Sequence, residues 1–295
     1  MKKLAEELLN LEIIWETETR GLLHCPGAHL HTKKTGPRDT VIHLDGVPTL
    51  YCFHESCAEI ISDANHILRD NLTPMTPEEL QEAKNKKRRH AEIAEAAKVV
   101  GNNLSRTEDF WPEIFENPIA PNESFERFLS IWPDDSFIWL GDVWDTGPIK
   151  GTGHFQLVDF WKRSMPNLYA NRFTTSSTFT FGAVDRIVSR VAATPFKVVE
   201  FDSLSQDIKT NRRLGAARLK YLSKHLDLVM IVDSGNKSLH GWFRNNSNFD
   251  EEMEFFCKRL GADTKTMRPA QPVRLPGARR ENGKVQSILW ISTRL

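Results

Sequence analysis

Residues 230–243, MIVDSGNKSLHGWF, form the stretch on which the fold depends. A run of apolar β-formers ends at Asp233, and four small or polar residues follow before a second β-like run begins. Two such runs joined by so short a connection predict a β-hairpin. Lys237 lies in the connection, and Ser238 and His240 occupy alternate positions in the second run. Alternate residues of a strand share one face, so a lysine, a hydroxyl and an imidazole are expected around one turn.

Similar short strand-like runs occur through residues 105–295, and two helical patterns interrupt them. Helices are expected at 211–226 and at 250–260, the second introduced by Asn248 and closed by Gly261. Strands mixed with helices, several in hairpin-like succession, predict an α+β fold. The expected strands are 136–141, 154–161, 196–202, 226–233, 238–243, 271–277 and 285–291.

Three regions divide the chain. Residues 1–72 hold three of the four cysteines and predict a small metal-binding module. Residues 73–104 predict a polar connecting helix, capped by Thr76 and stopped by Gly101. Residues 105–295 carry the strands and predict the main domain.

Composition narrows the class of protein but not its partner. The chain has 295 residues, with lysine plus arginine equal to aspartate plus glutamate at 39 each, so a nucleic-acid site must be a local patch. No stretch approaches the ~20 apolar residues that cross a bilayer, and we expect no membrane contact. The N-terminal residues predict an amphipathic helix and not a signal sequence. Four cysteines favour a reducing, cytoplasmic location.

Two short segments near the N-terminus carry metal-ligand spacing. HCPGAHLHT supplies Cys25 and His31, spaced C-x5-H, and YCFHESC supplies Cys52 and Cys57, spaced C-x4-C. The residues between them predict a β-hairpin that turns at Asp45-Gly46, which would bring the two pairs together. Zinc prefers four thiolate or imidazole ligands in a tetrahedron. The spacing predicts a structural zinc site with these four ligands.

The histidine ligand of this site is open on sequence alone. His29 and His54 lie close enough in sequence to replace His31. The remaining cysteine, Cys257, lies far away on a predicted helix and is expected in the core.

Two carboxylates share a strand in KVVEFDSLSQ, residues 197–206. Val199 and Phe201 are expected to face the core, so Glu200 and Asp202 face the other way together. Adjacent carboxylates repel unless a cation lies between them, and oxygen ligands suit Mg²⁺ or Mn²⁺. The alternative is an acidic strand that faces solvent.

A third acidic residue and a basic segment follow the second helix. Asp263 comes just after the helix, and Arg274 lies in a strand-like PVRLPG.

This series of motifs resembles the archaeo-eukaryotic primase superfamily, and more narrowly the primase-polymerases of phages, plasmids and other mobile elements. The resemblance rests on Glu200-Phe201-Asp202, Ser238-Leu239-His240 and Asp263, in that order, and on their surroundings VVEFDSL, DSGNKSLHGWF and RLPGARR. It covers residues 173–291. Glu200 stands where many members have aspartate, which still offers an oxygen ligand.

The resemblance implies a mixed-sheet catalytic core with a half like an RNA-recognition motif. The N-terminal module resembles the zinc ribbons that accompany replication primases, joined here by a long helix. The implied activity is nucleotidyl transfer from NTPs or dNTPs, in a DNA-dependent primase-polymerase that synthesises primers on single-stranded DNA. Single-stranded template and nucleotide are the implied partners, and a replicative helicase is a further one.

Roles for individual residues also come from the resemblance. Two Mg²⁺ or Mn²⁺ ions would be held by the three carboxylates, Glu200, Asp202 and Asp263. The triphosphate would be bound by the turn amides together with Lys237, Ser238 and His240, with Arg274 as a further phosphate or template contact.

Two other functions stay open at the level of sequence. One is a replication-initiation or nucleic-acid-binding protein that keeps a primase-like fold and catalyses nothing. The other is a metal-dependent nuclease, which also uses clustered carboxylates but does not explain the residues 237–240.

Overall fold

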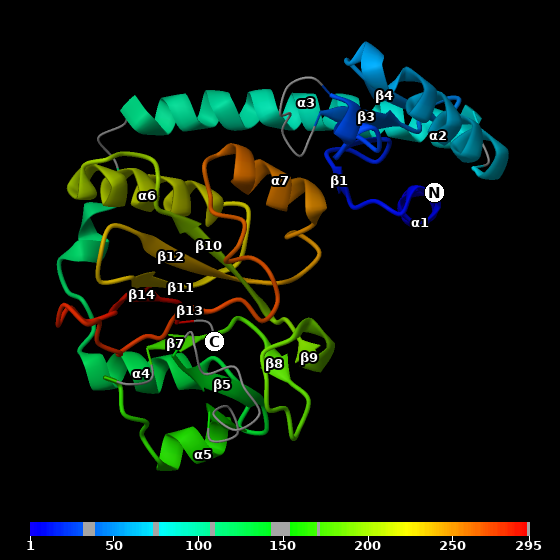
Figure 1. Ribbon diagram of the computed structural model, residues 1–295. Helices are drawn as coiled ribbons and strands as arrows, with labels where there is room; N and C mark the ends of the chain where they lie inside the picture. The colour runs from blue at the N-terminus through cyan, green and yellow to red at the C-terminus, as the bar shows by residue number, and fades with distance from the viewer. Residues whose placement is uncertain (32–38, 73–76, 107–109, 143–153, 170–171, 294–295) are drawn as a thin grey trace. The chain divides into compact units, whose positions relative to one another are not determined.

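The chain is an α+β protein built from several antiparallel sheets, as the sequence predicts. The computed structural model describes residues 1–31, 39–72, 77–106, 110–142, 154–169 and 172–293 (Figure 1). Two compact units divide it, Met1–Ala91 and Glu92–Leu295. Every strand pair in the described part of the chain is antiparallel, whereas the resemblance implied a mixed sheet.

The first unit packs two helices on a four-stranded sheet of order β1-β2-β3-β4. The hairpin expected between the two ligand pairs is confirmed as β3 and β4, with the Asp45-Gly46 turn between them. Its elements are α1 (Lys2–Leu9), β1 (Ile13–Trp15), β2 (Arg20–Leu23), η1 (Ala28–Leu30), β3 (Thr40–His43), β4 (Thr49–Cys52), η2 (Glu55–Cys57) and α2 (Ala58–Asn71).

A long helix, α3 (Pro77–Arg106), contains the boundary between the two units. The predicted stop at Gly101 is wrong, because the helix continues through it. Its C-terminal part is not a free connector: Ala97 is buried, and Val100 packs against the apolar core of the second unit. That packing offsets the cost of about 1 kcal/mol of a glycine inside a helix. Thr76, the expected cap, lies outside the described residues.

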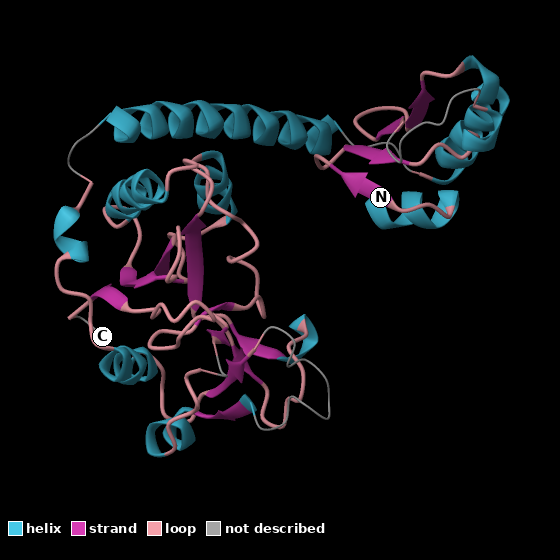
Figure 2. Cartoon of the chain, turned by 60° about the vertical axis from the view of Figure 1, so that its left-hand side comes forward, coloured by secondary structure: helices cyan, strands magenta, loops and turns pink. Residues whose placement is uncertain are grey.

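The second unit is built on two sheets with helices outside them. In one sheet, of order β10-β12-β11-β14, the face toward α6 and α7 is apolar. Its other face meets the layer that contains the second sheet, of order β13-β7-β5-β6, and helices α4 and α5 (Figures 1 and 2). The central strands are β10 (Phe196–Phe201), β11 (Leu228–Asp233), β12 (Leu239–Arg244) and β14 (Ile288–Ile291), and the helices beside them are α6 (Ile208–Leu222) and α7 (Glu251–Arg259).

The remaining elements of this unit are short. They are η3 (Pro112–Phe115), α4 (Pro121–Ser130), β5 (Phe137–Gly141), β6 (Phe155–Leu157), α5 (Val158–Arg163), β7 (Phe173–Thr174), β8 (Thr178–Phe179), η5 (Val188–Arg190), β9 (Val191–Ala193) and β13 (Val273–Arg274).

Strand β10 is buried on both faces. Val199 and Phe201 enter the core under α6 and α7, as expected. Phe196 and Val198, on the opposite face, enter a second core that is shared with α4 and α5. Glu200 continues that second face, so its carboxylate lies in the layer between the two sheets and not on an open solvent-facing surface.

Two local predictions need correction. The strand expected at 154–161 ends at Leu157, and the following residues form helix α5, whose Val158 and Trp161 are buried. Helix α7 is capped by Asp250, whose carboxylate accepts a hydrogen bond from the Met253 amide at 2.8 Å, and not by Asn248. The other predicted strands and both helices are present, and Gly261 follows α7 with a φ of 102°, as a C-terminal glycine does.

Among the helices that the structure describes, none is long and apolar enough to cross a bilayer.

Candidate functional site

The Cys/His cluster of the first unit has the geometry of a metal site. One potential ligand atom from each of Cys25, His31, Cys52 and Cys57 lies within 4.8 Å of all the others. Ligands at 2.0–2.3 Å from a tetrahedral zinc lie within about 4 Å of one another, so a small adjustment completes the shell. The four predicted ligands therefore form a group that could bind a metal such as zinc.

Close backbone packing brings the two ligand loops together. A Cβ added at Gly27 would lie 2.5 Å from the Cβ of Cys57, so any side chain there would push the loops apart. Cys57 is completely buried, and its Sγ is 3.1 Å from the carbonyl oxygen of His54.

The thiols of this cluster carry opposite pKa shifts. Burial, together with hydrogen bonds to Cys52 and Cys25, raises the pKa of Cys57 to about 12. Burial also acts to raise the pKa of Cys52, but hydrogen bonds from His54 outweigh it and lower that pKa to about 6. Three thiols so close together cannot all ionise unless a cation neutralises them, which is what a bound metal does.

The structure favours His31 as the histidine ligand without excluding its neighbour. The His54 ring stacks on the His31 ring at 3.9 Å between centroids, and its Nδ1 is 3.3 Å from the Cys52 sulfur. His54 is thus next to the cluster, while His29 belongs to neither the cluster nor these contacts.

In the second unit, a buried carboxylate is held by a serine and a histidine from the neighbouring strand. Glu200 and His240 face each other in the register of β10 and β12. Oε1 of Glu200 lies 3.2 Å from Nε2 of His240 and accepts a hydrogen bond from the Ser238 hydroxyl at 2.6 Å. The other ring nitrogen of His240, Nδ1, is buried and has no hydrogen-bond partner within the described part of the chain.

This environment keeps Glu200 ionised. Burial acts to raise the pKa of the carboxyl, but the charge and hydrogen bond of His240, the Ser238 hydroxyl and the charge of Arg274 outweigh it and lower the pKa to about 2. The side chain is 17% exposed, so these interactions are little screened by water.

Of the other two predicted carboxylates, Asp263 lies opposite Glu200 in the sheet and Asp202 follows the last residue of β10. Asp263 forms an isolated antiparallel bridge with Glu200, and its amide donates to the Glu200 carbonyl oxygen at 2.8 Å. Residues directly opposite in an antiparallel pair share a face, so the side chains of Glu200 and Asp263 lie on one face of the sheet.

The oxygens of the three carboxylates do not gather into one ligand set in the described part of the chain. Within the described residues, the Cys/His cluster is the one group of three or more potential metal ligands. Asp263 accepts a hydrogen bond from the Lys265 amide at 2.9 Å, and Asp202 accepts one from the Ser203 hydroxyl at 2.7 Å. Each acid therefore has its own local partner.

The predicted phosphate turn is arranged differently from expectation. Ser238 and His240 point at Glu200, as described above, and Lys237 lies 3.7 Å from the Asp202 carboxylate. The amide of Gly235, which has a φ of 71°, donates to the Asp233 carboxylate at 2.9 Å and so is not free to bind an anion.

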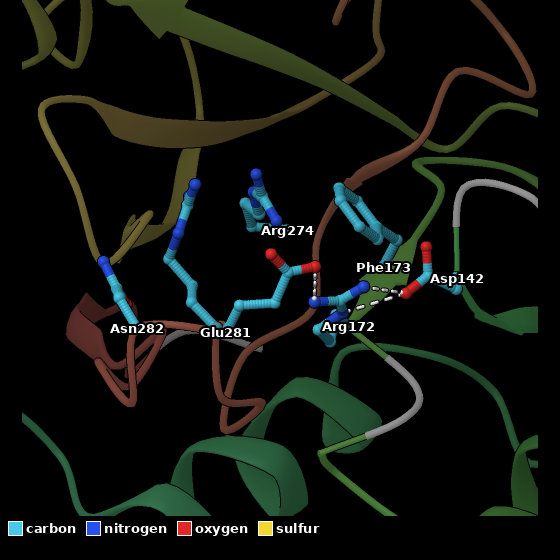
Figure 3. A pocket seen from close by; sticks show the side chains of 7 residues that line it. Asp142, Arg172, Phe173, Arg274, Glu281 and Asn282 are labelled. Carbon is cyan, nitrogen blue, oxygen red and sulfur yellow. Dashed lines mark hydrogen bonds and ion pairs between the residues drawn. The ribbon is translucent and has the colours of Figure 1, made fainter.

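An arginine-lined pocket lies next to this turn, and Figure 3 shows its lining. It has a volume of about 390 Å³. Arg280 connects it to the turn, because its Nη1 donates to the Ser234 carbonyl oxygen at 3.1 Å and the Ser234 hydroxyl is 2.9 Å from that of Ser238. The lining residues are Asp142, Arg172, Phe173, Arg274, Arg280, Glu281 and Asn282.

Arg274 belongs to this pocket, and its charge reaches Glu200. Its guanidinium lies over the Phe173 ring, 4.3 Å from the centroid. Burial lowers its pKa to about 10, and the charges of Arg280 and Arg172 add to that effect. It forms no hydrogen bond or ion pair with the residues that the structure describes, which leaves a partly buried cation open to an anionic ligand.

Sequence reasoning missed most of this pocket. Arg280 is the last residue of the basic segment RLPGARR, and that segment was a usable signal. Arg172 and Asp142 gave no usable signal in the sequence, because single charged residues beside short strands are common. The pairing of strand β7 with β13 and with β5 brings Arg172 and Asp142 into the pocket.

No protein-family model, no curated protein and no solved structure matches this chain.

Proposed function

We propose that the second unit is a primase-polymerase domain that transfers nucleotides from NTPs or dNTPs to a primer on single-stranded DNA. One observation carries the proposal: Glu200, held ionised by Ser238 and His240, has Asp263 opposite it in the sheet and lies within electrostatic reach of Arg274. Carboxylates on one side and unpaired cationic charge on the other suit a ligand that carries both metal ions and phosphates.

The three acids would hold Mg²⁺ or Mn²⁺ once their side chains rotate toward a common point. Their donor set consists of oxygens alone, which these hard cations prefer. When bound, such ions neutralise charge at the reacting phosphate and activate the attacking 3′-hydroxyl. The bound nucleotide and metal would have to replace the local partners of Asp202 and Asp263 described above.

The basic side chains would bind and orient the nucleotide. Lys237, released from Asp202 when a metal takes over that carboxylate, offers a mobile point charge to the triphosphate. Arg274 offers a planar guanidinium that can bind a phosphate through two hydrogen bonds. His240 would act mainly by fixing the orientation and charge of Glu200, and its Nδ1 remains available as a donor or acceptor.

The zinc module of the first unit would hold the template or the initiating nucleotide. Its exposed Tyr51 and Phe53 contact each other edge to face, with ring centroids 5.0 Å apart. Exposed aromatic rings are the surfaces on which single-stranded bases stack.

A primer-synthesis assay with the full chain tests the proposal. Single-stranded DNA, labelled NTPs or dNTPs and Mn²⁺ should give extended product, and Asp202→Ala should abolish it while leaving template binding largely intact. Glu126→Gln is the matched control, because Glu126 is an exposed acid on α4. Undiminished product from Asp202→Ala would contradict the metal-site assignment.

The second candidate function is a non-catalytic initiation or nucleic-acid-binding protein. The observation that favours it is that the oxygens of the three acids do not converge within the described residues. In the same assay, this function gives a shift of the labelled template but no nucleotide incorporation by the wild-type chain.

A further inference from the structure

The arginine pocket contains a carboxylate from an exposed turn. Glu281 reaches into it and accepts a hydrogen bond from Nη1 of Arg172 at 2.8 Å, as Figure 3 shows. The Glu281 side chain is 86% exposed, whereas that of Arg172 is 20% exposed. An exposed acid thus partners a mostly covered arginine.

The two acidic partners of Arg172 are not equivalent. Asp142 accepts a hydrogen bond from Nε of Arg172 at 2.9 Å and another from its Nη2. The Asp142 side chain is 20% exposed, the same as that of Arg172. Such a pair, with two donors to one carboxylate and little water, is the stronger contact. The contact with Glu281 is exposed and single, so it contributes little and is easily broken. Asp142 therefore fixes Arg172, and Glu281 only occupies one of its donors.

The pocket as a whole has more positive than negative groups. Among the residues that the structure describes, three guanidinium groups line it against two carboxylates. Arg280 donates one hydrogen bond to the Ser234 carbonyl oxygen. The Arg274 guanidinium has no hydrogen-bond or ion-pair partner among the described residues. If the Glu281 side chain leaves, the excess of positive charge grows by one, and a donor of Arg172 faces the pocket without a partner.

Glu281 can leave without disturbing the backbone that presents it. The turn is closed on both sides of Glu281 by main-chain hydrogen bonds, from the Arg280 amide to the Lys284 carbonyl oxygen at 2.9 Å and from the Gly283 amide to the Arg280 carbonyl oxygen at 2.9 Å. The bridge between Arg279 and Val285 extends this hairpin. Only side-chain rotation is needed to open the pocket.

We propose that Glu281 is a resident counter-anion of this pocket, and that a phosphate group of the ligand displaces it from Arg172. The inference rests on the proposed function in that it takes the ligand to be the polyphosphate tail of a nucleotide. Displacement costs the Arg172–Glu281 contact, so a single phosphate gains less from the pocket than a chain of phosphates that also reaches Arg274 and Arg280. The pocket thereby favours nucleoside triphosphates over monophosphates.

Equilibrium binding to the full zinc-loaded chain tests this role. The probes are inorganic tripolyphosphate, a nucleoside triphosphate and the matching monophosphate, titrated without added Mg²⁺ and with the zinc content checked afterwards. Glu281→Gln keeps the shape of the side chain and removes its charge. It should tighten binding of both polyphosphate probes about two- to fivefold, as expected for the loss of an exposed competing ion pair. It should not narrow the preference for the triphosphate over the monophosphate, because the cost of displacing Glu281 is removed for both ligands.

Controls separate this role from general electrostatics. Glu126→Gln removes the same charge from an exposed site on α4 and should change none of the three affinities. In the Arg172→Gln background, Glu281→Gln should lose most of its effect, because the contact that it releases is gone. Unchanged or weaker polyphosphate binding by Glu281→Gln, or no polyphosphate binding by any variant, would overturn the inference.

The inference and the proposed function fail in different ways. Tighter polyphosphate binding by Glu281→Gln in a chain that incorporates no nucleotide supports the counter-anion and contradicts the polymerase. Primer synthesis by a chain whose binding is insensitive to Glu281→Gln supports the polymerase and overturns the counter-anion.

Discussion

Nε2 of His240 lies 3.2 Å from Oε1 of Glu200, and the two residues are direct partners across strands β10 and β12. The imidazole is 3% exposed, so little water is available to replace the interaction of either group with the other. A buried carboxylate without such a partner would take up a proton near neutral pH. The pair explains how an acid remains charged between two apolar cores, and its consequences can be measured.

The first prediction concerns acid stability. The pKa of Glu200 in the folded chain, about 2, lies below the ordinary value of 4.5. Its contribution to the free energy of unfolding is therefore fully present above pH 4.5 and is lost as the pH falls toward 2. The shift corresponds to about 3 kcal/mol at most. Between pH 5 and 2.5, without added Mg²⁺ or Mn²⁺, wild-type chain should lose more stability than Glu200→Gln in chemical denaturation.

The control for that experiment is Glu126→Gln, which should follow the wild-type pH dependence. Parallel curves for wild type and Glu200→Gln would mean that the carboxyl is not held ionised by Ser238 and His240.

The second prediction concerns the Cys/His cluster. Removal of the metal with a chelator, or Cys57→Ser, should unfold the first unit and leave the second folded, because so small a unit depends on its ligand shell. Structural zinc contributes on the order of 10 kcal/mol to small domains that fold around it. Metal content per chain and limited proteolysis of residues 1–91 measure the loss.

Cys257→Ser is the matched control for the cluster, since Cys257 is equally buried but lies in the core of the second unit. It should change the stability of the second unit and leave the metal content unchanged. Equal metal content in the Cys57→Ser chain and the wild type would show that the cluster is not the metal site.

Much of this fold could be predicted from local patterns. Strand β10 was expected because apolar residues alternate on both sides of Glu200, and β12 because Ser238 and His240 follow a short turn. The Cys/His cluster followed from ligand spacing in two loops joined by a hairpin. In each case the deciding interactions lie close together in sequence, or within one hairpin.

The parts that sequence did not predict depend on contacts between distant segments. The continuation of α3 past Gly101 depends on the packing of its C-terminal part against the core of the second unit. Arg172 and Glu281 are 109 residues apart, and they meet because β13 pairs with β7. Ser238 was expected to bind phosphate, but its hydroxyl donates a hydrogen bond to Glu200 at 2.6 Å. The spacing of residues along the chain cannot decide whether a serine hydroxyl donates to a carboxylate or to a phosphate.

The third prediction uses two glycines of the C-terminal segment. Gly277 and Gly283 have φ values of 87° and 79°, so a side chain is strained at either position. A Cβ at Gly277 would also lie 2.4 Å from the Pro121 carbonyl oxygen, whereas one at Gly283 would meet nothing within 4 Å. Gly283→Ala should cost about 1 kcal/mol of unfolding free energy.

Gly277→Ala should cost more, roughly 3 kcal/mol or above, because α4 must move as well. Urea denaturation of the two variants measures the difference. Equal destabilisation by both substitutions would show that α4 does not pack against the Arg-x-Pro-Gly segment as closely as the structure has it.

The last prediction concerns Arg274, whose guanidinium lies over Phe173 without an ion pair among the described residues. Burial lowers its pKa to about 10, which means that the folded chain disfavours this charge. Arg274→Gln should therefore leave the melting temperature unchanged or raise it slightly, while nucleoside triphosphate binding weakens by about tenfold or more, as expected for the loss of hydrogen bonds from a charged donor. Arg268→Gln, at an exposed position outside the pocket, should change neither quantity. A lower melting temperature with unchanged nucleotide affinity would make Arg274 a structural residue, whereas opposite effects on stability and binding are typical of a charge that is retained for its ligand.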